Sequence, residues 1–144
     1  MTSREIAALV AEASPLLEGA VVDDIHQSDE HVVFVTFYGP ASGKLFLLVS
    51  TRPGLSRFHL VEDRPPALPL PPPFCEAARK HLKGSRLKSL RQVGGDRVGE
   101  FFFRRKSGEA SVLVLEMTRE KGELILTIEE GKLKGEHRLQ KQKK

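Results

Sequence analysis

The spacing of hydrophobic residues changes from a helical to a strand period near residue 20. Across residues 3–18, apolar side chains recur every three or four positions, which predicts an amphipathic helix. The apolar face consists of Ile6, Leu9, Val10, Ala13, Leu16 and Leu17. Thr2 or Ser3 can cap the first turn, and Gly19 ends the helix. We expect this face to pack in the core.

After residue 20, short runs of β-branched and aromatic residues alternate with turn-forming residues. These runs predict strands at 21–27, 31–38, 44–50 and 56–61. Because the intervening turns are short, the strands favour an antiparallel meander whose order follows the chain.

A proline-rich segment, residues 64–73, divides the chain and holds six of its nine prolines. Proline lacks a backbone N–H and cannot complete a sheet ladder, so the segment predicts an extended connector. The alternative interpretation is a ligand for a proline-recognising domain.

A short helix and a second set of strands follow the connector. Phe74, Ala78 and Leu82 share one face of this helix, and Gly84 closes it. The later runs predict strands at 86–93, 98–105, 110–117 and 123–128. Together the two halves predict an α+β fold in which two mainly antiparallel sheets pack as a β-sandwich with flanking helices. We expect the domain to span residues 1–131 and the basic segment 132–144 to be partly disordered, since it lacks an apolar stripe.

The net charge of +4 conceals a basic block. Residues 79–106 hold ten lysines and arginines against two acidic residues, whereas residues 1–78 hold five against ten. Such a block can steer an anionic partner toward the protein. The alternative is a solvated face whose cations pair with neighbouring carboxylates, and we expect about half of them to do so.

Six of these cations are candidate phosphate contacts: Arg79, Lys80, Lys83, Arg86, Lys88 and Arg91. Strict alternation along the predicted strand limits how many can meet one ligand. It places Arg86, Lys88 and Leu90 on one strand face, and Leu87, Ser89 and Arg91 on the other.

Several classes of function are disfavoured. No apolar run approaches the roughly 20 residues of a membrane span, and the start does not read as a signal peptide, so we expect a cytoplasmic protein without membrane contact.

The single cysteine, Cys75, rules out an internal disulfide or a cysteine-based zinc cluster. His26 and His31 lie near aspartates but are better explained by a polar hairpin than by a metal site. Nucleotide-binding loops and nucleophile elbows are absent. We expect no enzyme activity, no cofactor and no metal.

Four motifs resemble a known family. They are Pro72-Pro73-Phe74-Cys75, Arg79-Lys80-His81-Leu82, Gln92 with Asp96-Arg97, and Arg57-Phe58-His59. The chain resembles the NFACT amino-terminal domain of ribosome quality-control factors, long labelled fibronectin-binding protein A in bacteria. The resemblance covers most of the chain, although Arg119-Glu120-Lys121-Gly122-Glu123 departs from the family's pattern.

The resemblance implies a fold similar to the amino-terminal domain of formamidopyrimidine-DNA glycosylases. It also implies binding to tRNA on obstructed large ribosomal subunits and support of alanine tailing of stalled nascent chains. Asp96 and Arg97 match the family's pair at tRNA, while Gln92, Arg57 and His59 complete the implied site. The chain begins Met1-Thr2-Ser3 rather than with the glycosylase's catalytic proline, so glycosylase chemistry is not expected.

Three alternatives stay open. Aspartate in a glycine-rich turn often only bonds its own backbone, which would give Asp96 a purely structural role. The fibronectin-binding label suggests a protein-interaction module that contacts an extracellular-matrix protein. Analogy with the glycosylase fold suggests a non-catalytic DNA-binding domain.

Overall fold

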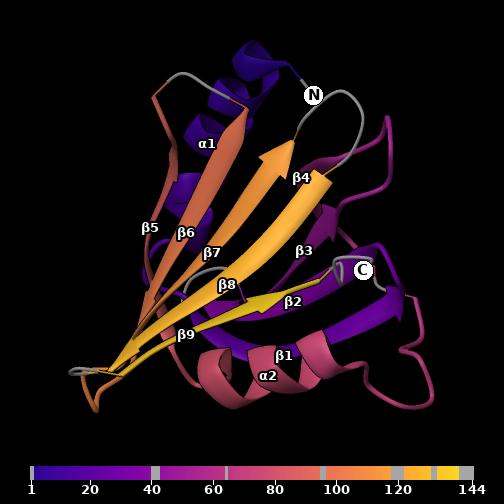
Figure 1. Cartoon of the computed structure of the whole chain (residues 1–144). Coiled ribbons are helices and arrows are strands. Elements are labelled where there is room, and N and C mark those ends of the chain that lie inside the picture. The colour runs from indigo at the N-terminus through magenta and orange to yellow at the C-terminus, as the bar shows by residue number, and fades with distance from the viewer. Residues whose placement is uncertain are drawn as a thin grey trace.

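The computed structural model describes residues 2–39, 43–63, 65–94, 97–117, 122–130 and 133–139. Within these ranges the chain forms two helices and nine strands (Figure 1). The helices are α1 (Ser3–Leu17) and α2 (Pro73–Leu82). The strands are β1 (Val21–Asp29), β2 (Val32–Gly39), β3 (Gly43–Ser50), β4 (Arg57–Val61), β5 (Arg86–Gln92), β6 (Val98–Arg104), β7 (Ala110–Met117), β8 (Gly122–Glu130) and β9 (Leu133–Arg138).

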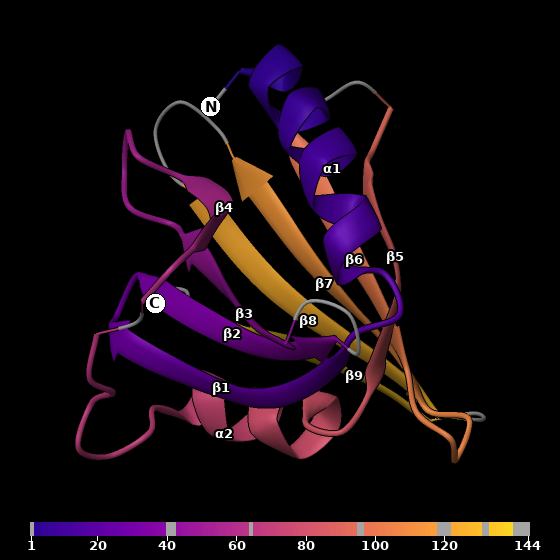
Figure 2. The same ribbon diagram turned by 180° about the vertical axis from the view of Figure 1, so that it is seen from behind.

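All nine strands belong to one antiparallel sheet in the order β4-β3-β2-β1-β5-β6-β7-β8-β9. The predicted α+β class and antiparallel pairing are confirmed, but the prediction of two separate sheets packed as a sandwich is wrong. β1 and β5 join the halves over a few residues: Val21 lies opposite Arg86, and four backbone hydrogen bonds link residues 19–22 to residues 84–87. Because this seam is short, the sheet bends there and the strands of the two halves run in different directions (Figures 1 and 2).

The core lies between the inner faces of the two halves. Phe37 of β2 stacks on Phe103 of β6 with ring centroids 6.4 Å apart. Phe58 of β4 meets Phe101 of β6 edge-on at 5.4 Å. All four rings are buried. These contacts between distant strands hold the bend of the continuous sheet closed.

The helices cover the two ends of this bend. α1 packs on β5 and buries Ile6, Ala13 and Leu17. Its first turn is closed by Thr2 and Glu5, and the backbone N–H of Thr2 lowers the pKa of the Glu5 carboxyl. α2 packs on β1 (Figure 2), and its predicted apolar face is confirmed, with Phe74, Cys75, Ala78 and Leu82 buried.

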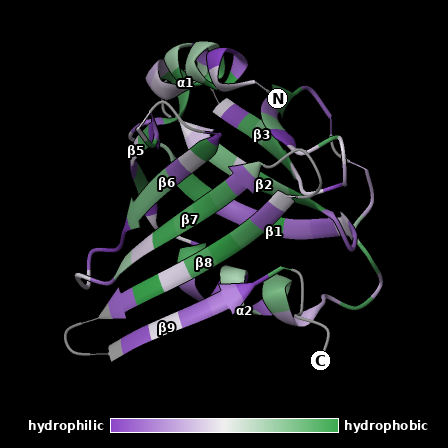
Figure 3. Cartoon of the chain, turned by 45° about the horizontal axis from the view of Figure 1, so that its top comes forward, coloured by the Kyte–Doolittle hydropathy of each residue, from purple (hydrophilic) through white to green (hydrophobic). Residues whose placement is uncertain are grey.

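β9 lies within the segment 132–144, for which the sequence predicted a basic, partly disordered tail. Residues 133–138 pair with β8, so that Leu133 lies opposite Glu130 and Arg138 opposite Ile125. The strand is hydrophilic next to the more apolar β7 and β8 (Figure 3). A charged edge strand needs no apolar stripe, and charge on an edge opposes pairing with other chains. This is why its pattern resembled a tail. Residues 140–144 lie outside the described residues.

Candidate nucleic-acid interface

The candidate interface is the stretch 73–97 and the strands beside it, and its first part, α2, is fixed to β1 by Arg79. The Nε atom of Arg79 donates to the Ile25 carbonyl at 2.7 Å and lies 3.4 Å from Oδ1 of Asp24. Beneath it, burial raises the pKa of the Cys75 thiol, as expected of a packed rather than a reactive cysteine. The Nε–H of Arg79 thus serves the fold.

The carboxyl end of α2 is held by the loop between β6 and β7. Arg105 donates from Nε to the His81 carbonyl at 2.9 Å, and from Nη2 to the carbonyls of Lys80 at 2.6 Å and Lys83 at 2.9 Å. His81 Nδ1 donates to Oε1 of the buried Glu109 at 2.7 Å. These bonds satisfy carbonyls that a helix end leaves without partners. The side chains of Lys80 and Lys83 remain exposed.

β5 presents more cations to solvent than strict alternation predicts. The register of β5 against β6 shifts between Leu87 and Ser89, which marks a β-bulge at Lys88. As a result Leu87 and Leu90 are both buried, and the predicted split of Arg86, Lys88 and Arg91 between two strand faces is wrong. Those three side chains are all exposed.

These strand cations differ in their partners. Arg91 Nε donates to Oε1 of Glu100 on β6 at 2.9 Å, so its charge is largely balanced. Arg86 instead donates from Nη1 to the Gly19 carbonyl and makes no ion pair with a described carboxylate.

The turn after β5 is braced on two sides. Gln92 Nε2 donates to the Ser3 carbonyl at the start of α1 at 2.8 Å. The Arg97 carbonyl accepts from Met117 N at 2.8 Å, and Val93 N donates to the Val98 carbonyl at 3.0 Å. The Arg97 side chain is half-buried and forms no ion pair with any described carboxylate. Asp96, the other residue of the predicted pair, lies outside the described residues.

Arg57 and His59 lie on the edge strand β4. They share the strand face opposite the buried Phe58. β4 is the first strand of the sheet order and β5 the fifth. Partial burial, with the Arg57 cation adding to it, lowers the pKa of His59. The predicted site residues therefore come from three places in the fold: α2, β5 with its turn, and the edge strand β4, which the bend brings against β6.

Sequence reasoning missed the loop that follows β6. Residues 104–106 belong to the predicted basic block, but the sequence assigned them no role. The register places Arg104 directly opposite Arg86, and Arg105 holds α2. The run Arg104-Arg105-Lys106 was a visible signal, but only the strand pairing shows what it faces.

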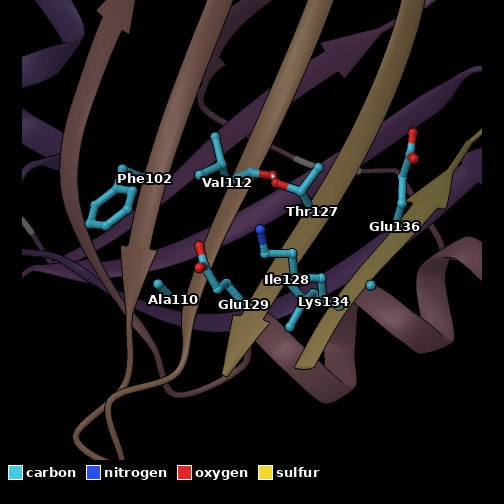
Figure 4. A pocket seen from close by; sticks show the side chains of 9 residues that line it. Phe102, Ala110, Val112, Thr127, Ile128, Glu129, Lys134 and Glu136 are labelled. Atoms are coloured by element: carbon cyan, nitrogen blue, oxygen red, sulfur yellow. Dashed lines mark hydrogen bonds between the residues drawn. The ribbon is translucent and has the colours of Figure 1, made fainter. Parts of the chain in front are cut away.

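A hollow of about 430 Å³ lies on the outer face of β6 to β9 (Figure 4). Phe102 and Val112 contribute apolar surface, while Glu129, Lys134 and Glu136 lie at the charged side. Apolar side chains and mixed charge do not suit a phosphate backbone. None of the predicted site residues lines this hollow.

Neither a cluster of metal-binding side chains nor a membrane-spanning helix occurs in the described ranges. These ranges contain no group of three or more His, Cys, Asp or Glu side chains able to hold a metal ion. His26, considered above as a ligand, stacks on Phe34 and lies 3.2 Å from the Pro65 carbonyl. No helix in the same part of the chain is long and apolar enough to cross a membrane.

Comparison with known proteins gives one family. The model of the NFACT N-terminal and middle domains matches residues 3–134. The ribosome quality control complex subunit NEMF of Mus musculus is 31% identical over 123 residues, which cover 85% of this chain and 11% of NEMF. The Rqc2 homolog RqcH of Bacillus subtilis is 31% identical over 121 residues, covering 81% of this chain and 21% of RqcH. The chain thus spans only a fraction of these relatives.

Solved structures share the fold. The N-terminal domain of the fibronectin-binding protein PavA from Streptococcus pneumoniae matches with a TM-score of 0.82 at 21% identity, over 88% of this chain and 51% of that one. The fibrinogen binding protein from Staphylococcus aureus matches with a TM-score of 0.73 at 26% identity, over 88% of this chain and 46% of that one.

Proposed function

The chain belongs to the family of NFACT N-terminal and middle domains, as its motifs indicated, and we propose that it is the RNA-contacting domain of a ribosome quality-control factor. Its partner is tRNA on an obstructed large ribosomal subunit, and its role is to support alanine tailing of the stalled chain. The name of its relative NEMF, a ribosome quality control complex subunit, supports a role in ribosome quality control. Because the chain spans only a fraction of these relatives, we infer that stable binding to a ribosomal subunit needs the remaining parts of a full-length factor.

The observation that carries this proposal is the position of Arg97, which lies next to strand ends that are fixed by hydrogen bonds and has no ion-pair partner among the described carboxylates. Gln92 and the Met117 backbone fix the ends of the turn, while Arg97 has no described carboxylate to neutralise it. A cation whose backbone carbonyl is already hydrogen-bonded to a neighbouring strand loses less conformational entropy on binding. In this role Arg97 contacts a tRNA phosphate or base edge, and Asp96 orients it or accepts from a base amine.

The proposed role is binding, without catalysis or a cofactor, in the cytoplasm. Two side chains with potential acid–base chemistry, His81 and Glu109, are occupied with each other beside the end of α2. Recognition of RNA through phosphates and bases needs neither a nucleophile nor a metal.

The test is a titration of labelled tRNA with wild type and with Asp96→Ala/Arg97→Ala. A charge-neutral control exists in Asp29→Ala/Arg52→Ala, which removes an ion pair between the end of β1 and the loop that joins β3 to β4. Loss of charge-assisted hydrogen bonds worth about 1.5–3 kcal/mol predicts an affinity roughly ten to a hundred times lower for the first variant. The control should bind as wild type does. Equal affinities for all three proteins would contradict the proposal.

A second candidate function is protein binding through the outer-face hollow. Its apolar side chains, such as Phe102 and Val112, suit a protein better than a nucleic acid. Two proteins of similar structure are named for fibronectin or fibrinogen binding. Immobilised fibronectin and duplex DNA, run beside tRNA at two salt concentrations, separate the candidates. Binding to fibronectin that salt does not weaken would favour the second function, and preference for duplex DNA would favour neither.

A further inference from the structure

Two arginines face each other across the start of the β5–β6 pair. Arg86 and Arg104 are directly opposite partners in the register. Together with Lys88, Arg105 and Lys106 they line a hollow of about 350 Å³, whose remaining lining is Val21 and Gly84. It lies where the chain leaves α2 and enters β5, beside the β6–β7 loop (Figure 2). Five of its seven lining residues are cationic.

Four of these cations have no ion-pair partner among the described carboxylates. In the described ranges, Arg86, Lys88, Arg104 and Lys106 form no ion pair with a carboxylate, whereas Arg105 lies 3.9 Å from Glu109. Arg86 is held by the Gly19 carbonyl, and the Arg104 guanidinium lies 5.6 Å from the centre of the Phe102 ring. These interactions orient both guanidinium groups without cancelling their charge.

Like charges directly opposite on neighbouring strands destabilise a sheet. A bound anion between them would replace that repulsion with attraction. Arginine suits this task because its planar fork can hold two phosphate oxygens at once. The hollow is therefore arranged as an anion site on a rigid part of the sheet.

We propose that this hollow binds the phosphate backbone of RNA, as a second contact separate from the Arg97 turn. The inference rests on the proposed function and adds a site to it. At about 3.3 Å per residue, the seven-residue β5 separates the hollow from the turn by roughly 20 Å, so the two sites hold different phosphates. Lys80 and Lys83, exposed at the adjoining end of α2, extend the same basic surface.

RNA fits this hollow better than an acidic protein does. Val21 is the one apolar residue among those that line it, and it is half-buried. A protein partner would find little apolar surface to cover, although the centre of a protein interface is usually apolar. Binding of a polynucleotide draws instead on neutralised phosphates and released counterions.

The test compares two variants that each remove two positive charges. Arg86→Gln/Arg104→Gln alters the hollow, and Arg52→Gln/Arg138→Gln removes two arginines that are paired with carboxylates elsewhere. Labelled tRNA and a short single-stranded RNA are titrated at several salt concentrations. Because the hollow variant can neutralise two fewer phosphates, the slope of log K against log salt should fall by about 1.4–1.8, and affinity at low salt by about tenfold or more. The control variant should keep the wild-type salt slope and the wild-type affinity at low salt.

The outcomes separate this site from the function on which it rests. RNA binding by wild type that is unchanged in the hollow variant, or reduced equally in the control, overturns the site alone. If RNA binding is retained in Arg97→Ala but lost in the hollow variant, the hollow rather than the Arg97 turn is the main contact. A wild-type chain that binds no RNA overturns both. If Arg86→Gln/Arg104→Gln unfolds, Lys88→Gln/Lys106→Gln provides the same charge change with exposed lysines.

Discussion

Arg105 and Arg104 are neighbours in the sequence but occupy opposite situations in the fold. Arg105 donates its hydrogen bonds to three carbonyls at the end of α2 and lies beside Glu109. Arg104 is exposed, opposite Arg86, with no described carboxylate paired to it. The comparison teaches that a basic block contains two kinds of cation. Paired cations hold the fold together, and unpaired cations are available to a ligand.

The largest effect that separates the two kinds is expected from Arg105→Ala. It leaves three helix-end carbonyls and the buried Glu109 with fewer partners, and should lower the free energy of unfolding by about 2–4 kcal/mol. Arg104→Gln removes no hydrogen bond to the described chain and should change the free energy of unfolding by less than about 1 kcal/mol. Urea unfolding followed by circular dichroism measures both. A variant at Arg104 that is as unstable as the one at Arg105 would remove the distinction.

A smaller effect is expected from Arg91→Gln. Arg91 is exposed and paired with Glu100, and pairs of this kind contribute at most about 1 kcal/mol to stability. Since Glu100 already balances the charge, we expect tRNA affinity to fall less than it does for Arg86→Gln. Parallel titrations of the two single variants measure this. A larger drop in affinity for Arg91→Gln than for Arg86→Gln would show that ion pairing with a carboxylate does not distinguish the cations that bind tRNA from those that do not.

The smallest expected effect is on the pH dependence of stability, through His59 and the neighbouring Arg57. Burial and Arg57 lower the pKa of His59, so the unfolded chain takes up a proton there at higher pH than the folded chain does. The stability contributed at this site is therefore present above the unfolded value near about 6.5 and is lost as pH falls below it. In His59→Gln, unfolding stability should decline less between pH 7.5 and pH 5. An equal decline in wild type and variant would contradict this.

Local patterns in the sequence were sufficient for most elements of the fold. The helical face of α1, the face of α2 with Phe74 and Leu82, and the antiparallel strands follow from periods that neighbouring residues determine. The joining of β1 to β5 through Val21 and Arg86 did not follow, because it depends on how the chain returns after the proline-rich connector. β9 was missed because a charged edge strand lacks an apolar stripe.

The candidate site was less predictable than the fold. Composition located the basic block, and motif resemblance singled out Asp96 and Arg97. Neither could show that Arg79 is bonded to the Ile25 carbonyl, or that a bulge at Lys88 turns three cations outward. Ion pairing and strand register depend on tertiary structure. The opposition of Arg86 and Arg104 therefore appears only in the folded chain.

The most direct test of the account is the acetylation of lysines with and without bound tRNA, mapped by mass spectrometry. We expect tRNA to protect Lys80, Lys83, Lys88 and Lys106, which surround the hollow and the end of α2. Lys44, which pairs with Asp23, and Lys134, on β9, should react equally in both samples. Equal protection of all six lysines, or protection of Lys44 and Lys134 alone, would contradict the claim that the unpaired cations form the RNA-binding surface.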